Sequence, residues 1–126
     1  MSKQNPFAWI EIPVTDMRRA AAFYETVLDC KIEIVDFSGI LMGWFPSAGP
    51  EAAGAAGSLI QQESYVPSHH GTLVYLACDD VQEPLDRVEA AGGKILQPKT
   101  MISEEHGFMG VMEDCEGNRV AFHSNK

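Results

Sequence analysis

The sequence predicts an α+β fold made of two βαβββ modules that form a curved mixed sheet around a cup. Two observations carry this prediction. A strand followed by an Asp-capped helix occurs twice, because Asp80 follows Asp16 by 64 residues and the flanking residues correspond at the same offset. The stretch 107–124 is typical of two short strands around a Gly-Asn turn, and such a hairpin needs a larger sheet to be stable.

The first module is predicted from its alternating and helical patterns. Residues 7–14 alternate with period two, which places Trp9 and Glu11 on one face and Ile10 and Ile12 on the other. Thr15-Asp16 is a helix N-cap signal, and an apolar stripe at helical spacing follows as far as Leu28. Further strands are expected at 31–37, 40–45 and 58–63, with a Gly- and Ala-rich loop at 46–57.

The second module repeats this order. Residues 72–78 are a predicted strand, Asp79-Asp80 are predicted to cap a helix over 81–91, and Gly92-Gly93 are predicted to end it. A strand over 94–101 and a loop over 102–106 lead into the terminal hairpin. We therefore expect residues 1–126 to form a single domain of two repeats, about 6–64 and 71–124.

Composition limits the classes of partner. The net charge of −9 argues against binding to nucleic acid or to an anionic membrane surface, and it favours a small cationic ligand. No apolar run approaches the roughly 20 residues of a membrane span. The N-terminal residues show no apolar signal core and the three cysteines are widely spaced, so we expect a cytoplasmic protein with reduced thiols. Each small module leaves an uncovered sheet face and strand edges, which predicts a homodimer.

The chain resembles the vicinal oxygen chelate superfamily, which includes glyoxalase I, extradiol dioxygenases and bleomycin-resistance proteins. The matching stretches are WIEIPVTDMRRAAAFYETVL, GTLVYLACDDVQEPLDRVEAAGGKI and EDCEGNRVAFHS, the last with Cys115 where the family usually has Pro. The resemblance implies paired βαβββ modules, usually as a dimer, with a cup-shaped site. It is specific for the fold and not for the reaction.

The metal-binding positions implied by this resemblance are filled by side chains that cannot bind metal. They are Trp9 on the first strand, Leu73 on its repeat counterpart and Ala121 on the last strand. The fourth position lies near 60–63, where Gln61 or Glu63 could supply one oxygen. Because a divalent ion needs three or four ligands, we predict no metal and no other cofactor.

The preferred hypothesis is therefore a metal-free protein that binds a small organic molecule in an aromatic-lined cup. One alternative is a lyase-, isomerase- or dioxygenase-like enzyme that uses Glu11, Tyr75 and His123, with or without a metal displaced to Glu11, Glu63 and His123. Another is a dimeric interaction protein whose cup is vestigial. The neighbouring His69 and His70 are expected in a solvated connector. The predicted ligand-binding residues are Trp9, Trp44, Gln61, Leu73, Phe108 and Ala121.

Overall fold

The computed structural model describes residues 6–126, so residues 1–5, on which the expected cytoplasmic location partly rests, lie outside the described part. The same order of strands and helix occurs twice, as the sequence repeat predicts. The first half contains β1 (Trp9–Pro13), α1 (Met17–Leu28), β2 (Glu33–Phe37), β3 (Ile40–Trp44) and β4 (Ala56–Gln61). The second half contains β5 (Val74–Ala77), α2 (Gln82–Ala91), β6 (Lys94–Ser103), β7 (Gly107–Glu113) and β8 (Arg119–Ser124).

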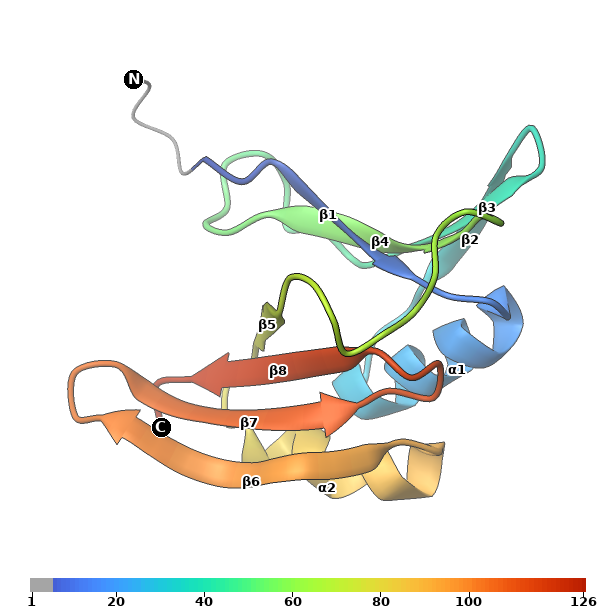
Figure 1. The fold of residues 1–126 in the computed structure, drawn as a ribbon. Coiled ribbons are helices and arrows are strands. Elements are labelled where there is room, and N and C mark those ends of the chain that lie inside the picture. Colours follow the sequence, from blue (N-terminus) through green and yellow to red (C-terminus); the bar gives the residue numbers. More distant parts are fainter. Residues whose placement is uncertain (1–5) are drawn as a thin grey trace.

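Each half forms its own four-stranded mixed sheet (Figure 1). The first sheet has the order β1-β4-β3-β2, and the second has the corresponding order β5-β8-β7-β6. In both sheets the first strand pairs in parallel with the last strand of the same half, and the remaining pairs are antiparallel. The α+β class and the repeated βαβββ order are thus confirmed. The sheets are not joined by any strand pair within residues 6–126, and they remain two sheets rather than one.

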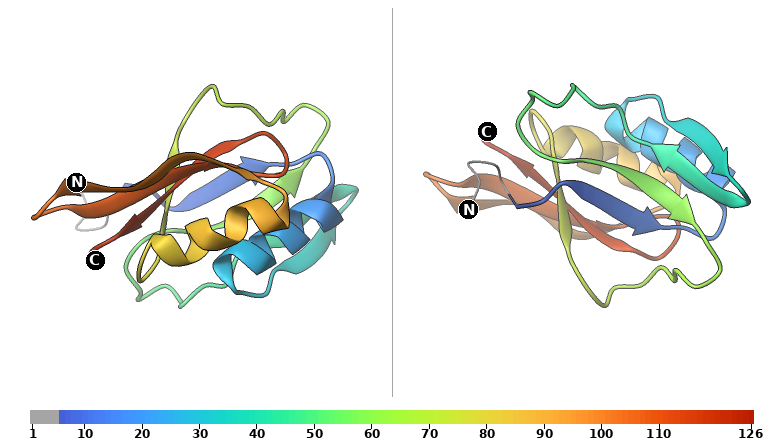
Figure 2. Two further views of the ribbon diagram at one scale, coloured as in Figure 1. Left: turned by 90° about the horizontal axis from the view of Figure 1, so that it is seen from below. Right: turned by 90° about the horizontal axis from the view of Figure 1, so that it is seen from above.

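The two helices lie side by side and join the halves through one core (Figure 2). Helix α1 buries Met17, Ala20, Ala21, Phe23, Tyr24 and Val27, and α2 buries Pro84, Leu85 and Val88. These side chains meet Ile12 and Leu59 of the first sheet and Met112 and Phe122 of the second. Burial of this apolar surface is the main force that holds the two halves together. No helix of the described chain is long and apolar enough to cross a bilayer.

Each sheet has one face against its helix and one face that no helix covers, which we call the open face. A Cβ built on Gly43 would touch Met17, Ile32 and Leu59, so Gly43 faces α1. Because side chains alternate along a strand, the neighbouring Met42 and Trp44 of β3 point away from α1. Strand register then places a row of four residues across the open face of the first sheet, in the order Glu11, Ser58, Trp44, Glu33. The open face of the second sheet carries Tyr75, Ala121, His123, Met109 and Val111.

The predicted helix caps differ between the two halves. Asp16 is the N-cap of α1, as predicted, and its carboxylate accepts a hydrogen bond from the backbone N–H of Arg19 at 3.2 Å. The prediction that Asp79-Asp80 caps α2 is wrong in detail, because the N-cap is Val81 and no side chain caps it. Asp80 lies one residue before Val81 and accepts from the Gln82 N–H at 2.9 Å while it pairs with Lys99 at 2.9 Å.

Candidate functional site

A groove of about 520 Å³ lies between the β1 edge of the first sheet and the β5–β8 edge of the second. It occupies the place where the two sheets approach each other without pairing. Its lining is mostly apolar, with few charged groups, as is usual for small-molecule sites. The lining residues are Phe7, Trp9, Ile10, Glu11, Ile12, Pro13, Val66, Ser68, His70, Thr72, Leu73, Val74, Tyr75, Asn118, Arg119 and Val120.

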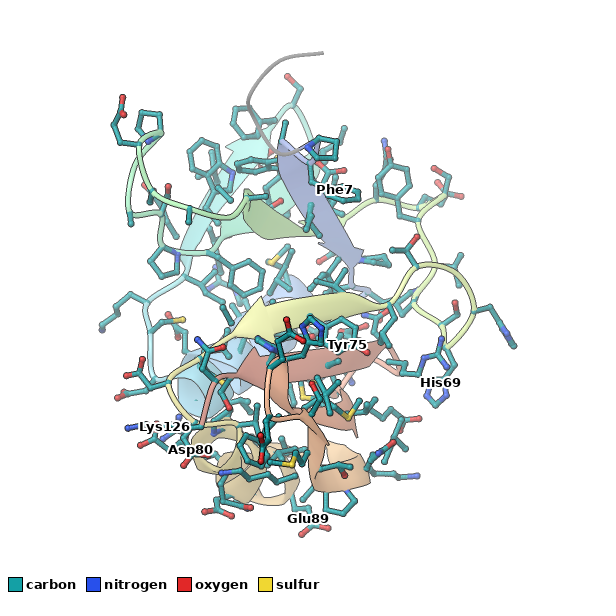
Figure 3. The ribbon with its side chains drawn as sticks, turned by 90° about the vertical axis from the view of Figure 1, so that its left-hand side faces the viewer. Phe7, His69, Tyr75, Asp80, Glu89 and Lys126 are labelled. Atoms are coloured by element: carbon teal, nitrogen blue, oxygen red, sulfur yellow. The ribbon has the colours of Figure 1, made fainter. Side chains whose placement is uncertain are left out.

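The two walls of the groove come from corresponding strands of the repeat. Trp9 and Glu11 are successive open-face residues of β1, since side chains alternate along a strand. Leu73 precedes β5 and Tyr75 lies within it, again two residues apart on one face. Phe7 and Tyr75 lie on opposite sides of the space between β1 and β5 (Figure 3). Tyr75 is half exposed, so its ring is available to a ligand.

Asn118 fixes the spacing between the walls at one end of the groove. Its side-chain amide donates to the carbonyl oxygen of Pro13 at 2.7 Å, which ties β1 to the turn before β8. Its amide oxygen accepts from the backbone N–H of Ser68 at 3.2 Å, which ties down the connector between the halves. Asn118 is buried, so these bonds are shielded from water and hold the three segments in register.

The same turn carries a buried carboxylate. Asp114 is 1% exposed, and its Oδ1 accepts from the backbone N–H groups of Glu116 and Asn118 at 2.8 and 2.9 Å. Its Oδ2 accepts from the Tyr24 hydroxyl at 2.6 Å and from the Asn118 amide at 3.1 Å. Burial, followed by the nearby charge of Asp114, raises the pKa of Tyr24 well above its ordinary value, so this phenol stays protonated and donates.

Glu116 reaches from this turn to the start of α1 in the other half. Its carboxylate accepts from the backbone N–H groups of Thr15 and Asp16 at 2.7 and 3.0 Å and from the Thr15 hydroxyl at 2.6 Å. Arg19 completes the set with an ion pair at 2.8 Å. Burial alone would raise the pKa of Glu116, but the hydrogen bonds from Thr15 and Arg19 outweigh burial and lower it. A carboxylate also suits the positive end of a helix dipole.

The predicted ligand-binding residues lie in different places. Trp9 and Leu73 line the groove, whereas Trp44 lies outside it on the open face, with its ring centroid 6.0 Å from that of Trp9. Gln61 points to the helix side, where its amide oxygen accepts from the Met17 N–H at 2.8 Å.

Phe108 and Ala121 are also outside the groove. Phe108 packs against the core. Ala121 is fully buried within the second sheet.

The predicted catalytic residues are only partly brought together. Glu11 and Tyr75 share the groove, but His123 lies on the open face of the second sheet and is not among the groove residues. Register places His123 diagonally across from Tyr75. The Nε2 of His123 lies 2.7 Å from the carbonyl oxygen of His106. A carbonyl can only accept, so Nε2 carries the proton and Nδ1 is the basic nitrogen.

Three polar groove residues have no signal in the sequence pattern. Ser68, His70 and Arg119 lie in a connector or at the start of a strand, and only the fold brings them beside β1. His69 and His70 have different surroundings, since the Nε2 of His69 lies 2.8 Å from the Glu113 carboxylate while His70 lines the groove. A repeat offset aligns equivalent strands but gives no information about which connector residues reach the opposite half.

The four positions at which the family resemblance implies metal ligands do not fit a divalent metal ion. Trp9, Leu73 and Ala121 offer no usable lone pair, and Gln61 is engaged with the N-terminus of α1. Among residues 6–126, no group of three or more His, Cys, Asp or Glu side chains is placed to hold a metal. This includes the displaced set of Glu11, Glu63 and His123.

Comparison with known proteins places the chain beside glyoxalase-like domains. A family model described as Glyoxalase/Bleomycin resistance protein/Dioxygenase superfamily matches residues 7–122. A glyoxylase-like domain-containing protein from Didymella fabae is 28% identical over 117 residues, which covers 89% of this chain and 88% of that protein.

Solved structures show the same fold at low sequence identity. Glyoxalase I from Zea mays is 20% identical with a TM-score of 0.69; the match covers 95% of this chain but only 46% of the maize chain. The fosfomycin resistance protein FosX from Listeria monocytogenes is 16% identical with a TM-score of 0.68, covering 100% of this chain and 94% of FosX. At these identities the likeness concerns the fold alone.

Proposed function

This chain belongs to the glyoxalase/bleomycin resistance protein/dioxygenase superfamily, and from that premise we propose that it binds a small organic molecule without a metal ion. The main observation in favour of the proposal is that apolar side chains replace the expected metal ligands in the groove. Trp9 and Leu73 occupy positions at which the family resemblance implies metal ligands, and both line an apolar groove of about 520 Å³. Such a volume lies within the range of small-molecule sites.

The walls support binding through apolar contact with a few orienting polar groups. Trp9, Leu73 and Tyr75 supply large apolar surfaces, and Glu11 and Arg119 supply single charges. Neither Glu11 nor Arg119 makes an ion pair within residues 6–126. Both charges are therefore free to orient a ligand.

The test combines metal analysis with ligand binding. Protein purified without added metal should hold well under one divalent ion per chain by elemental analysis. A small-molecule library should yield compounds that raise the melting temperature, since a ligand stabilises the native state it binds. Leu73→Trp, which fills the groove, should abolish that shift, while Leu96→Trp on the exposed surface of β6 should preserve it. Stoichiometric metal that survives dialysis, or an equal effect of both variants, would refute the proposal.

His123 favours a second candidate function, proton transfer on a bound carbon acid. Its Nδ1 is a base held in one orientation by the 2.7 Å contact between Nε2 and the His106 carbonyl. Exchange of carbon-bound hydrogen in D₂O, followed by NMR, should then fall about 10²- to 10⁴-fold in His123→Gln. His69→Gln is the matched control, because that ring is paired with Glu113 outside the groove. Equal rates in both variants would exclude this candidate.

A further inference from the structure

Both tryptophans of the protein lie together on the open face of the first sheet. Their rings meet edge to face, with the centroids 6.0 Å apart and the planes at 75°. Trp9 is 42% exposed and Trp44 is 38% exposed, although large aromatic rings usually add most stability when they are buried. Trp9 also lines the groove, so this aromatic pair is continuous with the site proposed above.

Carboxylates are the only charged groups on the strands of this face. Glu11 and Glu33 stand at the two ends of the row that contains Ser58 and Trp44. No Lys or Arg occurs among the open-face residues of β1 to β4. Lys31 lies near Glu33 and Trp44 in a separate surface hollow, so Glu33 has a basic neighbour that Glu11 lacks. Glu11 is exposed and makes no ion pair within residues 6–126.

Ser58 adds an unsatisfied polar atom between Glu11 and Trp44. Its side chain is fully buried, and its Oγ has no hydrogen-bond partner among the described residues. A buried hydroxyl without a partner is unfavourable by about 1–3 kcal/mol. An amine that carries an N–H group would donate to this hydroxyl as well as to the Glu11 carboxylate, whereas a quaternary amine would pair with the carboxylate alone.

We propose that Trp9, Trp44 and Glu11 bind the positively charged end of the ligand, a protonated or quaternary amine. Indole faces attract an organic cation through the ring quadrupole, and a nearby carboxylate adds a direct charge interaction. Arg119 lies beside Asn118 at the Pro13 end of the groove, about 13 Å along β1 from Trp9 at the rise of a strand. Arg119 repels the cationic end and so fixes the direction in which the ligand lies. The inference depends on the proposed function, because it names the class of ligand for the same groove.

Tryptophan fluorescence reports on ligand binding at this site, because Trp9 and Trp44 are the two tryptophans of the protein. Choline and benzyltrimethylammonium are the cationic probes, and 3,3-dimethylbutan-1-ol is the neutral isostere of choline. Both cations should change the emission saturably, and the neutral alcohol should bind about 5- to 20-fold more weakly than choline. Glu11→Gln should weaken choline by a similar factor without changing the alcohol. Glu104→Gln, which removes the same charge from an exposed turn, should change neither.

The outcomes distinguish a failure of the cation inference from a failure of the groove as a binding site. Equal affinity for choline and its neutral isostere, or equal effects of Glu11→Gln and Glu104→Gln, would overturn the cation inference. The groove would then still be supported if neutral compounds raised the melting temperature and Leu73→Trp abolished that shift. Absence of any fluorescence change with all three probes would also overturn the cation inference. Absence of any stabilising compound would overturn the groove as well.

Discussion

At the scale of single residues, Tyr24 and Asp114 connect the two halves more tightly than apolar packing alone. The Tyr24 hydroxyl donates to the Asp114 Oδ2 at 2.6 Å, and both side chains are almost completely buried. The two residues are far apart in the sequence and belong to different repeats. A charge-assisted bond in such a place is stronger than one at the surface, because water does not compete for it.

We predict that Tyr24→Phe lowers the free energy of unfolding by about 1–3 kcal/mol, because it removes one donor from a buried carboxylate. The three remaining donors to Asp114 should keep the fold intact. Urea denaturation followed by circular dichroism would measure the change. Tyr65→Phe is the matched control, since Tyr65 is 42% exposed, and its unfolding midpoint should not move. Equal midpoints for the two variants would contradict the prediction.

Single residues also show where sequence reasoning reaches its limit. The period-two pattern of β1 correctly placed Trp9 and Glu11 opposite Ile12, because alternation is a local property. Gln61 is predicted to bind ligand but points to the helix side, because its orientation depends on pairing with β1 and β3 and not on a local pattern. Asp80 is equivalent to Asp16 in the repeat, yet it is bound to Lys99 and lies before the cap. Contacts between segments that are far apart in the sequence cannot be predicted from a local pattern.

At the scale of elements, the turn between β7 and β8 stabilises the N-terminus of α1. Glu116 accepts from the backbone N–H of the N-cap Asp16, a group that a helix end otherwise leaves without a partner, and from that of Thr15 just before it. Because hydrogen bonds hold the pKa of Glu116 below its ordinary value of 4.5, the unfolded chain takes up a proton more readily than the folded chain. This stabilisation is complete above about pH 4.5 and is lost as the pH falls through the lower folded-state pKa.

We predict that Glu116→Gln lowers stability at pH 7 by about 1–3 kcal/mol, because neutral bonds replace charge-assisted ones. The variant should also lose less stability than the parent between about pH 6 and pH 3, since the titrating group is gone. Urea midpoints across that range would show both effects. Glu104→Gln in an exposed turn should follow the parent at every pH. An unchanged acid dependence in Glu116→Gln would show that Glu116 does not contribute it.

At the scale of the whole molecule, apolar side chains remain exposed on both sheets. Trp9, Trp44 and Phe37 are exposed on the first sheet, and Leu96, Met101 and Ile102 are exposed on β6 at the edge of the second. An uncovered edge strand of this length invites pairing with another chain. A closed twofold dimer is the commonest way to cover an edge such as β6.

We predict a homodimer with twice the 13.8 kDa mass of the chain at micromolar concentration. Sedimentation equilibrium would measure that mass. Met101→Glu combined with Ile102→Glu should shift the equilibrium toward the monomer if β6 lies in the interface, whereas Glu104→Gln in the adjoining turn should not. A species of 13.8 kDa alone across the micromolar range would contradict the dimer.

The overall arrangement was predictable only in part. The 64-residue offset between Asp16 and Asp80 correctly predicts the repeated βαβββ order, because that order depends on local patterns. The separation of the sheets and the groove between β1 and β5 depend on how α1 packs on α2 and on the bond from Asn118 to Pro13. Those long-range contacts have no periodic signature.

The bonds from Glu116 also constrain the order in which the protein folds during synthesis. Thr15 and Glu116 are separated by 101 positions, so the start of α1 leaves the ribosome long before the turn that completes it. At roughly 5–20 residues per second the delay is about 5–20 s, which far exceeds the time a helix needs to form. For that interval the first half must persist with the Tyr24 hydroxyl and the backbone N–H groups of Thr15 and Asp16 without their partners from the second half. A nascent chain stalled before residue 114 should therefore be readily cleaved by protease within α1, and release of the last strands should protect it.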